Sequence, residues 1–377
     1  RSSSLLEDAQ FRAYAGLYRT YMVPNNHPDL ELRLANLLDA VRMVYASTYF
    51  LGPKAFSRRV GQRTEEERMA VIIQQLVGTC YGDFFYPAIS GVAQSHNYYP
   101  FGRMRPEEGI ATIAMGLGRS VVEGERTLRF APRYPQLQPQ NASVEDMLNN
   151  SQRWFYSLRM EGACRLPVIE EDDCLHKQEV IEAEAQGPVG LLASTYVPEE
   201  HRIRDINHAR GHRVLTFAPI LKYGTFPLAP VLSEALAMGQ AGMGCPVEMV
   251  FSVNLSPDDD RPSEFAFLQL RPMTARAELM KVDITSDEIR QAVCFSSAAL
   301  GNAHHRELAD ILFVRPEVFD PAQSREIARQ IGQLNGLQMQ QERKYLLVGP
   351  GRWGSNDPWL GIPVKWTDIC GVGAFVE

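Results

Sequence analysis

Two apolar runs joined by a polar segment place the strongest constraint on how this chain folds. Residues 246–253 and 265–270 are rich in β-branched and aromatic side chains, and the polar segment 254–262 between them contains two prolines. A pattern of this kind predicts an antiparallel hairpin with a long loop. We therefore expect two neighbouring strands whose side chains alternate between the two faces of a sheet.

Three polar side chains of this hairpin are expected on one face. Gln269 and Arg271 share a face with Phe267 because their positions differ by two, whereas Leu268 and Leu270 take the other face. Glu248 can reach the same face as Gln269 from the neighbouring strand. A carboxylate and an amide oxygen suit Mg²⁺, and an arginine beside them can neutralise a phosphoryl group. The alternative is a charged pair at a sheet edge, with Gln269 exposed.

The composition is that of an ordinary globular protein, and it argues against some functions. The chain has 377 residues, of which 45% are hydrophobic, and this length corresponds to two or three domains. Its net charge of −7 argues against a surface that binds nucleic acid, and no apolar run has the length of a membrane helix. The six cysteines show no CxxC pair, so we expect free thiols in a reducing cytoplasm.

Three further features are expected in the first third of the chain. Residues 30–50 carry leucines and valines at helical spacing, which predicts an amphipathic helix. Residues 69–77 form an apolar run rich in β-branched side chains, which predicts a buried strand that ends at Gly78. The glycines at positions 116 and 118 could cradle a phosphate, although Gly-x-Gly alone is weak evidence.

The C-terminal part of the chain predicts a separate α/β module. Residues 311–314 and 345–348 are strand candidates, and residues 324–342 form a helix candidate with Ile331 and Leu334 on one face. This order predicts a βαβ unit with two parallel strands.

The ends of these two strands offer one place for an anion. Ligands often bind at the carboxyl ends of parallel strands, so Arg315 and residues 349–352 could form an anion site at one edge of the module. No catalytic pair accompanies them, and we prefer a structural or docking role.

Several motifs occur in the order found in a known family. They are Arg-Ser-Ser-Ser at residues 1–4, Gly-Leu-Gly at 116–118, and the strand pair PVEMVFSV and FAFLQLRPM. Together they resemble the ATP-grasp domain of the phosphoenolpyruvate synthase and pyruvate, phosphate dikinase family. The resemblance implies an α/β (α+β) fold. It consists of an ATP-grasp nucleotide-binding domain over residues 1–275 with its N-terminal lobe missing, and a C-terminal α/β module over residues 276–377.

The resemblance also implies a function and a set of site residues. The domain would bind ATP and Mg²⁺ and serve phosphoryl transfer to a histidine and then to pyruvate, with pyruvate or phosphoenolpyruvate bound by domains outside this chain. Its predicted site residues are Arg1 and Arg271 for the phosphates, Gln75, Leu76 and Val77 for the adenine, and Glu248 and Gln269 for Mg²⁺. We expect a cytoplasmic enzyme without nucleic-acid or membrane partners.

One departure from the family leaves alternatives open. The family has an acidic residue two positions before the metal-binding glutamate, and this chain has Pro246 there. The alternatives are a regulatory or degenerate ATP-binding module without turnover and an interaction domain that has lost ATP. Catalysis by positioning needs both lobes that hold the phosphates. Because the N-terminal lobe is missing, we expect this chain alone to be inactive.

Overall fold

The structure is a computed structural model that places most of the chain. It describes residues 1–4, 18–54, 67–97, 100, 104–122, 125–138, 143–161, 174–205, 211–256, 261–273, 284–296, 306, 308–341, 343–355 and 361–377. The chain folds into two compact units, Arg1–Arg276 and Ala277–Glu377, and each is described separately. Within the described residues no helix is long and apolar enough to cross a membrane.

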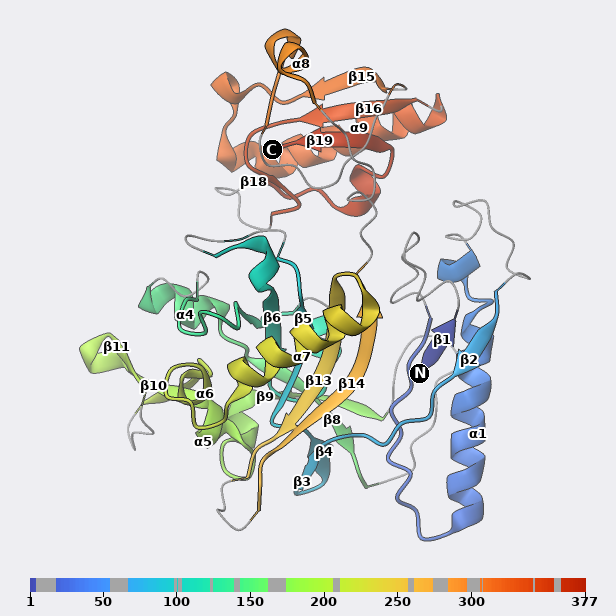
Figure 1. Cartoon of the computed structure of the whole chain (residues 1–377), viewed down its shortest axis with the longest axis vertical. Coiled ribbons are helices and arrows are strands. Elements are labelled where there is room, and N and C mark those ends of the chain that lie inside the picture. The colour runs from blue at the N-terminus through green and yellow to red at the C-terminus, as the bar shows by residue number, and fades with distance from the viewer. Residues whose placement is uncertain are drawn as a thin grey trace. The chain divides into compact units, whose positions relative to one another are not determined.

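A five-stranded antiparallel sheet forms the centre of the first unit (Figure 1). Its strand order is β14 (Glu264–Pro272), β13 (Val247–Asn254), β5 (Ile89–Gln94), β6 (Ile110–Ala114) and β7 (Leu128–Phe130). The antiparallel pairing of β13 with β14 confirms the predicted hairpin. The hairpin does not stand alone, because β13 also pairs with β5, more than 150 residues earlier in the sequence.

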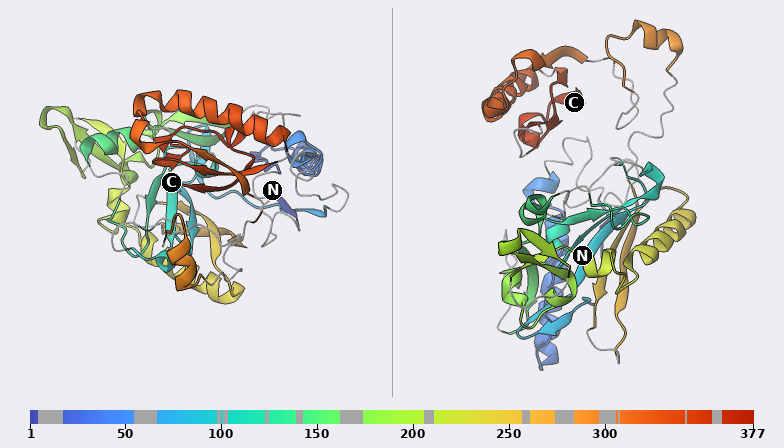
Figure 2. Two further views of the ribbon diagram at one scale, coloured as in Figure 1. Left: turned by 90° about the horizontal axis from the view of Figure 1, so that it is seen from above. Right: turned by 90° about the vertical axis from the view of Figure 1, so that its left-hand side faces the viewer.

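One face of this sheet is the core of the unit. The inward residues of β13, Val247, Met249 and Phe251, are fully buried and join one apolar cluster with Leu228 and Leu232 of helix α7 (Leu228–Met243). Figures 1 and 2 show α7 lying along β13 and β14. Burying each of these side chains stabilises the fold by about 1.5–3 kcal/mol. The opposite face of the sheet is therefore left for a ligand or another element.

A bulge changes the expected alternation in β14. Gln269 lies opposite Val250, but Phe267 lies opposite Phe251, so the register shifts by one residue between them. Neighbouring residues of β13 take opposite faces, which places Phe267 and Gln269 on opposite faces as well. The prediction that Phe267 shares the face of Gln269 is therefore wrong, and Phe267 is 53% exposed. Leu270, which pairs with the buried Met249, lies on the face opposite Gln269 as predicted. Leu268, predicted to share that face, is instead the extra residue of the bulge and lines the cleft.

Two smaller antiparallel sheets also belong to the first unit. One has the order β3 (Thr79–Tyr81), β4 (Phe84–Tyr86), β8 (Trp154–Arg159) and β9 (Leu175–Glu179), and the other has the order β11 (Arg202–Arg204), β10 (Ala193–Val197) and β12 (His212–Leu215). The short helices are α3 (Arg119–Val122), α4 (Val144–Asn150), α5 (Val189–Leu192) and α6 (Ala218–Leu221).

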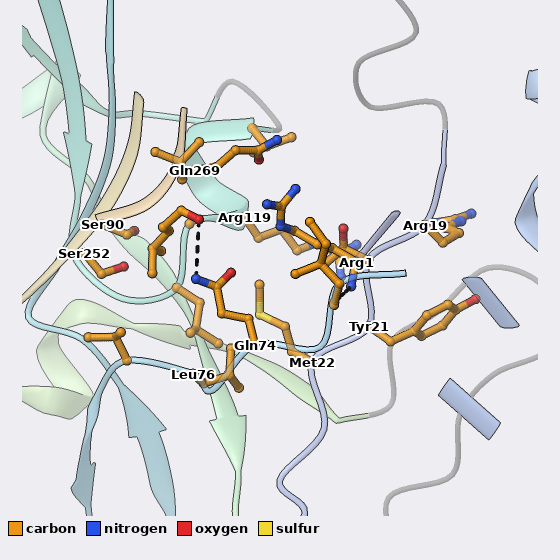
Figure 3. A pocket seen from close by; sticks show the side chains of 18 of the residues that line it. Arg1, Arg19, Tyr21, Met22, Gln74, Leu76, Ser90, Arg119, Ser252 and Gln269 are labelled. Carbon is orange, nitrogen blue, oxygen red and sulfur yellow. Dashed lines mark hydrogen bonds between the residues drawn. The ribbon is translucent and has the colours of Figure 1, made fainter. Parts of the chain in front are cut away.

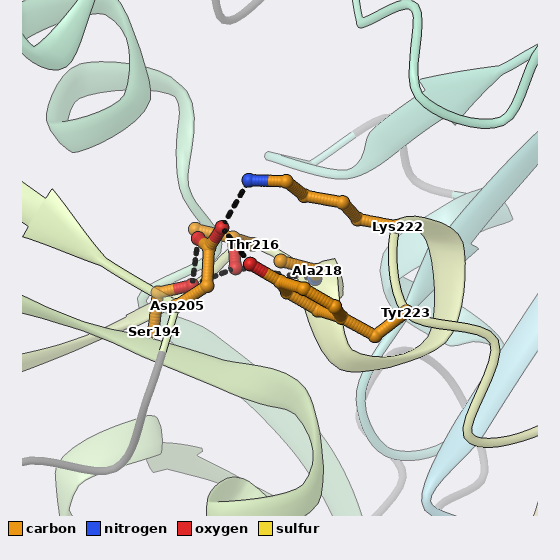
Figure 4. Close-up of polar contacts among 6 residues, drawn as sticks. All are labelled: Ser194, Asp205, Thr216, Ala218, Lys222 and Tyr223. Atoms are coloured by element: carbon orange, nitrogen blue, oxygen red, sulfur yellow. Dashed lines mark hydrogen bonds and ion pairs between the residues drawn. The ribbon is translucent and has the colours of Figure 1, made fainter.

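A polar cluster joins the β10–β12 sheet to the end of α6 (Figure 4). The carboxylate of Asp205 accepts hydrogen bonds from Lys222 Nζ at 2.5 Å, Tyr223 Oη at 3.1 Å and Ser194 Oγ at 3.2 Å. The buried hydroxyls of Ser194 and Thr216 lie 2.5 Å apart. Burial raises the pKa of Asp205, but the three hydrogen bonds together with the positive charge of Lys222 outweigh burial, and the net pKa is lowered.

The N-terminal part of the unit differs from its sequence predictions. β1 (Ser2–Ser4) pairs only with β2 (Met69–Val71) among the described strands. The predicted buried strand 69–77 is therefore wrong beyond Val71, since residues 72–75 are exposed and without strand pairing. Helix α1 (Leu30–Ser47) forms where predicted, but Leu34 and Leu38 lie on its exposed side.

The second unit contains a three-stranded parallel sheet. β15 (Leu308–Phe313) and β19 (Val372–Val376) flank β16 (Lys344–Val348), and helix α9 (Ser324–Gln340) connects β15 to β16. This confirms the predicted βαβ unit, although β19 was not predicted. Helix α8 (Ser286–Gln291) and the short strands β17 (Arg352–Trp353) and β18 (Gly361–Ile362) belong to the same unit.

Helix α9 buries a face slightly different from the predicted one. Ile331 is buried as expected, whereas Leu334 is exposed and the neighbouring Asn335 is buried. Asn335 Oδ1 accepts hydrogen bonds from Tyr345 Oη at 3.0 Å and Gly371 N at 2.9 Å, and its Nδ2 donates to Thr367 O at 3.3 Å. These bonds satisfy the buried amide and so offset the cost of its burial.

The cysteines do not all match the prediction of free thiols. Cys80, Cys245, Cys294 and Cys370 are reduced. Cys174 is buried and disulfide-bonded, so the prediction is wrong for this residue. Its partner lies outside the described residues.

Candidate functional site

The open face of the five-stranded sheet is the floor of a large cleft. The cleft has a volume of about 1650 Å³ and lies entirely within the first unit. Side chains of β5, β6, β13 and β14 form its floor, and residues 18–25, residues 71–77 and α1 contribute to its walls (Figure 3). A cleft of this volume has room for a ligand the size of a nucleotide, since small-molecule sites commonly have about 300–1,000 Å³.

A row of three polar side chains crosses the floor. Strand pairing places Gln94 of β5, Glu248 of β13 and Arg271 of β14 side by side. Gln94 Nε2 donates to Glu248 Oε2 at 2.7 Å, and Arg271 Nε donates to Glu248 Oε1 at 2.7 Å. Arg271 Nη2 donates to the same Oε1, which makes a charge-assisted pair. Glu248 is the only acidic residue among the described residues that line the cleft, and both of its carboxylate oxygens are thus engaged.

Gln269 lies one row further along the same face. It pairs with Val250, two residues after Glu248, so Glu248 and Gln269 are diagonal neighbours. Diagonal partners on a sheet are about 7–8 Å apart, within reach of long side chains. The structure therefore brings Glu248, Gln269 and Arg271 onto one face, as strand alternation predicted, and all three line the cleft.

Residues 72–77, the segment after β2, form part of a wall of the cleft. Gln75, Leu76 and Val77 all line the cleft, and Gln74 Nε2 donates to the carbonyl oxygen of Leu268 at 3.3 Å. Residues 75–77 belong to no strand, so their backbone groups are not used in a sheet. Several apolar residues also line the cleft; they are Met22, Phe85, Leu158, Met160 and Leu175.

The charged side chains that line the cleft are mainly positive. Among the described lining residues, Arg1, Arg19, Arg119 and Arg271 stand against Glu248 alone, an excess of three positive charges. The whole chain carries −7. A local positive excess on an acidic protein favours an anionic ligand at this place. Arg1, which was predicted to contact phosphates, therefore lies in the same cleft as Arg271.

The two glycines of the Gly-Leu-Gly segment have different environments. Gly116 has a φ of +87°, and a Cβ there would lie 2.7 Å from the carbonyl oxygen of Tyr156, so this glycine is required by packing. Gly118 lines the cleft, and a Cβ there would meet nothing closer than Ser90 Oγ at 3.8 Å. Only Gly118 is therefore placed where it could approach a ligand.

Gln94 and Arg119 are among the polar residues of the cleft that sequence reasoning missed. Gln94 lies beside Glu248 only because β5 pairs with β13, and no local sequence pattern reveals that pairing. Arg119 directly follows the Gly-Leu-Gly segment, which was the one available signal. Pro246 precedes β13, and its carbonyl oxygen accepts a hydrogen bond from Met273 N at 2.8 Å. No cluster of three or more metal-binding acidic, His or Cys side chains occurs among the described residues.

The edge predicted as a second anion site is largely a packed turn. A Cβ on Gly349 would lie 2.7 Å from the ring of Trp353, and the Trp353 indole donates to the carbonyl oxygen of Val376 at 3.2 Å. Arg315 follows β15 and is exposed. This arrangement fits the preferred structural role of the loop.

The sheet, the apolar wall and the mainly positive charged lining of the cleft are those of a nucleotide-binding domain of the ATP-grasp-like kind. Comparison with known protein families supports this class, since the AMP/ATP-binding domain of pyruvate phosphate dikinase matches residues 1–292. The match covers most of the chain, and the protein therefore belongs to the pyruvate phosphate dikinase and phosphoenolpyruvate synthase family. A search of curated proteins gives no match.

Proposed function

We propose that the cleft binds ATP together with Mg²⁺ in the service of phosphoryl transfer. The observation that carries the proposal is the row of Gln94, Glu248 and Arg271 beside Gln269, in a cleft whose charged lining is mainly positive and which also has apolar lining residues. An apolar wall suits a base, and a cluster of cations suits a chain of phosphates.

Each predicted residue has a role in this proposal. The backbone of Gln75, Leu76 and Val77 would read the edge of the adenine, because its polar groups are not committed to a sheet. Arg1 and Arg271 would bind phosphate oxygens through planar guanidinium groups.

The oxygen donors fit Mg²⁺ only if the nucleotide takes part. Glu248 and Gln269 would supply two oxygen ligands, and Mg²⁺ prefers six ligands, several of which are usually waters or substrate phosphates. In the structure both carboxylate oxygens of Glu248 accept hydrogen bonds from protein side chains. We therefore infer that the metal and the nucleotide bind together, with Arg271 moving from Glu248 to a phosphate.

The chain's contribution to phosphoryl transfer would be positioning and charge neutralisation. Arg1 and Arg271 would hold the phosphates in line, and Gln94 would keep Glu248 oriented while Arg271 leaves it. Bound Mg²⁺ would supply additional charge neutralisation at the phosphates. The acceptor would be a histidine and then pyruvate, on domains outside this chain.

A regulatory ATP-binding module without turnover is the second candidate. Pro246 favours it, because this position offers a carbonyl oxygen already bonded to Met273 N instead of a carboxylate. Incubation of the full-length protein with γ- and β-labelled ATP distinguishes the two. Label transferred to a histidine, or isotope exchange within ATP, supports the enzyme. ATP bound and recovered intact supports the regulatory module.

Calorimetric titration tests the binding site itself. We expect Glu248→Ala and Gln269→Ala, in the full-length protein, each to weaken Mg·ATP binding by about tenfold or more. Glu264→Ala, an exposed glutamate on the same strand β14, is the matched control and should bind like the parent. Variants of Glu248 and Gln269 that bind Mg·ATP as tightly as the parent, with an intact fold, would contradict the assignment.

A further inference from the structure

We propose that Arg119, held against the ring of Tyr156, is a phosphate-binding residue that makes the cleft selective for nucleotides with a chain of phosphates over the monophosphate. The inference rests on the proposed function, because it assigns a further contact to the same ligand. It differs from the predicted site residues, which lie on β13, on β14, at the N-terminal end of the described chain and in the segment after β2.

The turn that carries Arg119 is firmly built. Met115 N donates to Gln152 Oε1 at 2.8 Å, and Gln152 Nε2 donates back to Met115 O at 3.0 Å. Leu117 N donates to the carbonyl oxygen of Tyr156 at 2.8 Å, and Gly116 packs against that same carbonyl. The turn after β6 is therefore fixed on one side of Gly116 to Gln152, just before β8, and on the other side to Tyr156 of β8, and Arg119 starts from a defined position.

The side chain of Arg119 is also held in place. Its guanidinium carbon lies 5.1 Å from the centre of the Tyr156 ring, within the range of a cation–π contact. A guanidinium that contacts an aromatic ring still has donors along its edge for phosphate oxygens. Lys177 lies 5.3 Å from the same ring, but it pairs with Glu125 and does not line the cleft.

Arg119 and Arg271 approach the cleft from different parts of its floor. Arg271 lies on the edge strand β14, whereas Arg119 follows β6, and β13 and β5 lie between these two strands. Three strand spacings correspond to roughly 14 Å at the level of the backbone. Figure 3 shows Arg119 among the lining side chains, with Gln269 on one side of it in this view and Arg1 on the other. A chain of phosphates is better able than a single phosphate to contact two cations that start from strands separated in this way.

Titration with a series of ligands tests this assignment. Adenosine, AMP, ADP and ATP, each with Mg²⁺, are titrated into the parent and into Arg119→Ala and Arg119→Lys. We expect Arg119→Ala to weaken ATP binding by about 10- to 100-fold, as for the loss of a charge-assisted hydrogen bond, and adenosine binding by less than twofold. Arg119→Lys should recover part of the loss because it keeps the charge.

Two further variants separate positioning from structure. Tyr156→Leu keeps apolar bulk but removes the ring, and we expect it to weaken ATP binding less than Arg119→Ala does. Arg202→Ala, an exposed arginine on β11 outside the cleft, is the control for loss of a positive charge.

The possible outcomes separate the two proposals. Parent protein that binds none of the four ligands overturns the proposed function and this inference with it. If the parent binds ATP and the affinity of Arg119→Ala for ATP is within twofold of that of the parent, the role of Arg119 is overturned and the proposed function is not. Equal losses for adenosine and ATP in Arg119→Ala would show a purely structural role and would also overturn it.

Discussion

The ion pair between Glu248 and Arg271 should stabilise the fold by an amount that can be worked out from its burial. The side chains are 13% and 28% exposed, so the pair lies between the surface and the interior. Exposed ion pairs contribute about 0.2–1 kcal/mol, and removal of one partner from a buried pair costs about 3–5 kcal/mol. We therefore expect Glu248→Gln, which keeps the shape of the side chain, to destabilise the first unit by about 2 kcal/mol.

A double-mutant cycle measures the pair directly. Glu248→Gln is combined with Arg271→Met, and the two single variants are compared with the double variant. Because the chain has two units, hydrogen exchange of peptides from β13 and β14 reports the first unit separately. We expect a coupling energy of about 1–2 kcal/mol. Additive effects, with each single variant within about 0.5 kcal/mol of the parent, would refute the idea that this pair holds the row together.

Three other substitutions probe other parts of the chain. Burial raises the pKa of Asp205, but hydrogen bonds, chiefly from Lys222, hold it below its ordinary value. Ionised Asp205 therefore stabilises the folded state above about pH 4, and this stabilisation is lost as the pH falls through the folded-state pKa. Asp205→Asn should cost about 1 kcal/mol at pH 7, since solvent screens these partly exposed groups, and should flatten the acid loss of stability in thermal melts from pH 2 to 7. Gly116→Ala, at a φ of +87° and 2.7 Å from a carbonyl oxygen, should cost at least about 2 kcal/mol in urea unfolding. Asn335→Leu leaves Tyr345 Oη without its partner and should destabilise only the second unit, by about 1–3 kcal/mol, with ATP binding unchanged.

Local patterns were enough to predict the hairpin and the βαβ unit. Both depend on apolar runs with intervening polar or helical segments, and these signals lie within short windows of sequence. The face shared by Glu248, Gln269 and Arg271 followed from strand alternation. The bulge in β14 could not be predicted, because the register shift shows only in the pairing of β14 with β13 and leaves no local sequence pattern.

The cleft itself was misread in part because its lining looks like a core. Residues 69–77 are apolar and rich in β-branched side chains, which predicted a buried strand. In the structure Ile73 is 64% exposed, and residues 71–77 line the cleft. A surface that receives an apolar ligand needs the same side chains as a surface that receives another strand, so hydrophobicity alone cannot separate them. Gln94 escaped notice for a different reason, since its role depends on a long-range strand pairing.

The hydrogen bonds that Glu248 accepts predict strong coupling between the binding of Mg²⁺ and the binding of ATP. In the structure Arg271 donates to Glu248 Oε1, so the carboxylate and the guanidinium neutralise each other. If ATP attracts Arg271 away, Glu248 is left with an uncompensated charge, and bound Mg²⁺ compensates it. Each ligand should therefore raise the affinity for the other by the same factor, as thermodynamic linkage requires.

This coupling can be measured in the parent and in Glu248→Gln. Titrations of ATP at several Mg²⁺ concentrations should show a rise in affinity of about tenfold or more in the parent, beyond that expected from formation of Mg·ATP in solution. In Glu248→Gln, the increase in ATP affinity with Mg²⁺ should be only that expected from formation of Mg·ATP in solution, because the amide carries no charge for Mg²⁺ to compensate. Exposed Glu264 offers the control, since Glu264→Gln alters a carboxylate on the neighbouring strand β14. An equal rise in parent and Glu248→Gln would show that Glu248 does not link the metal to the nucleotide.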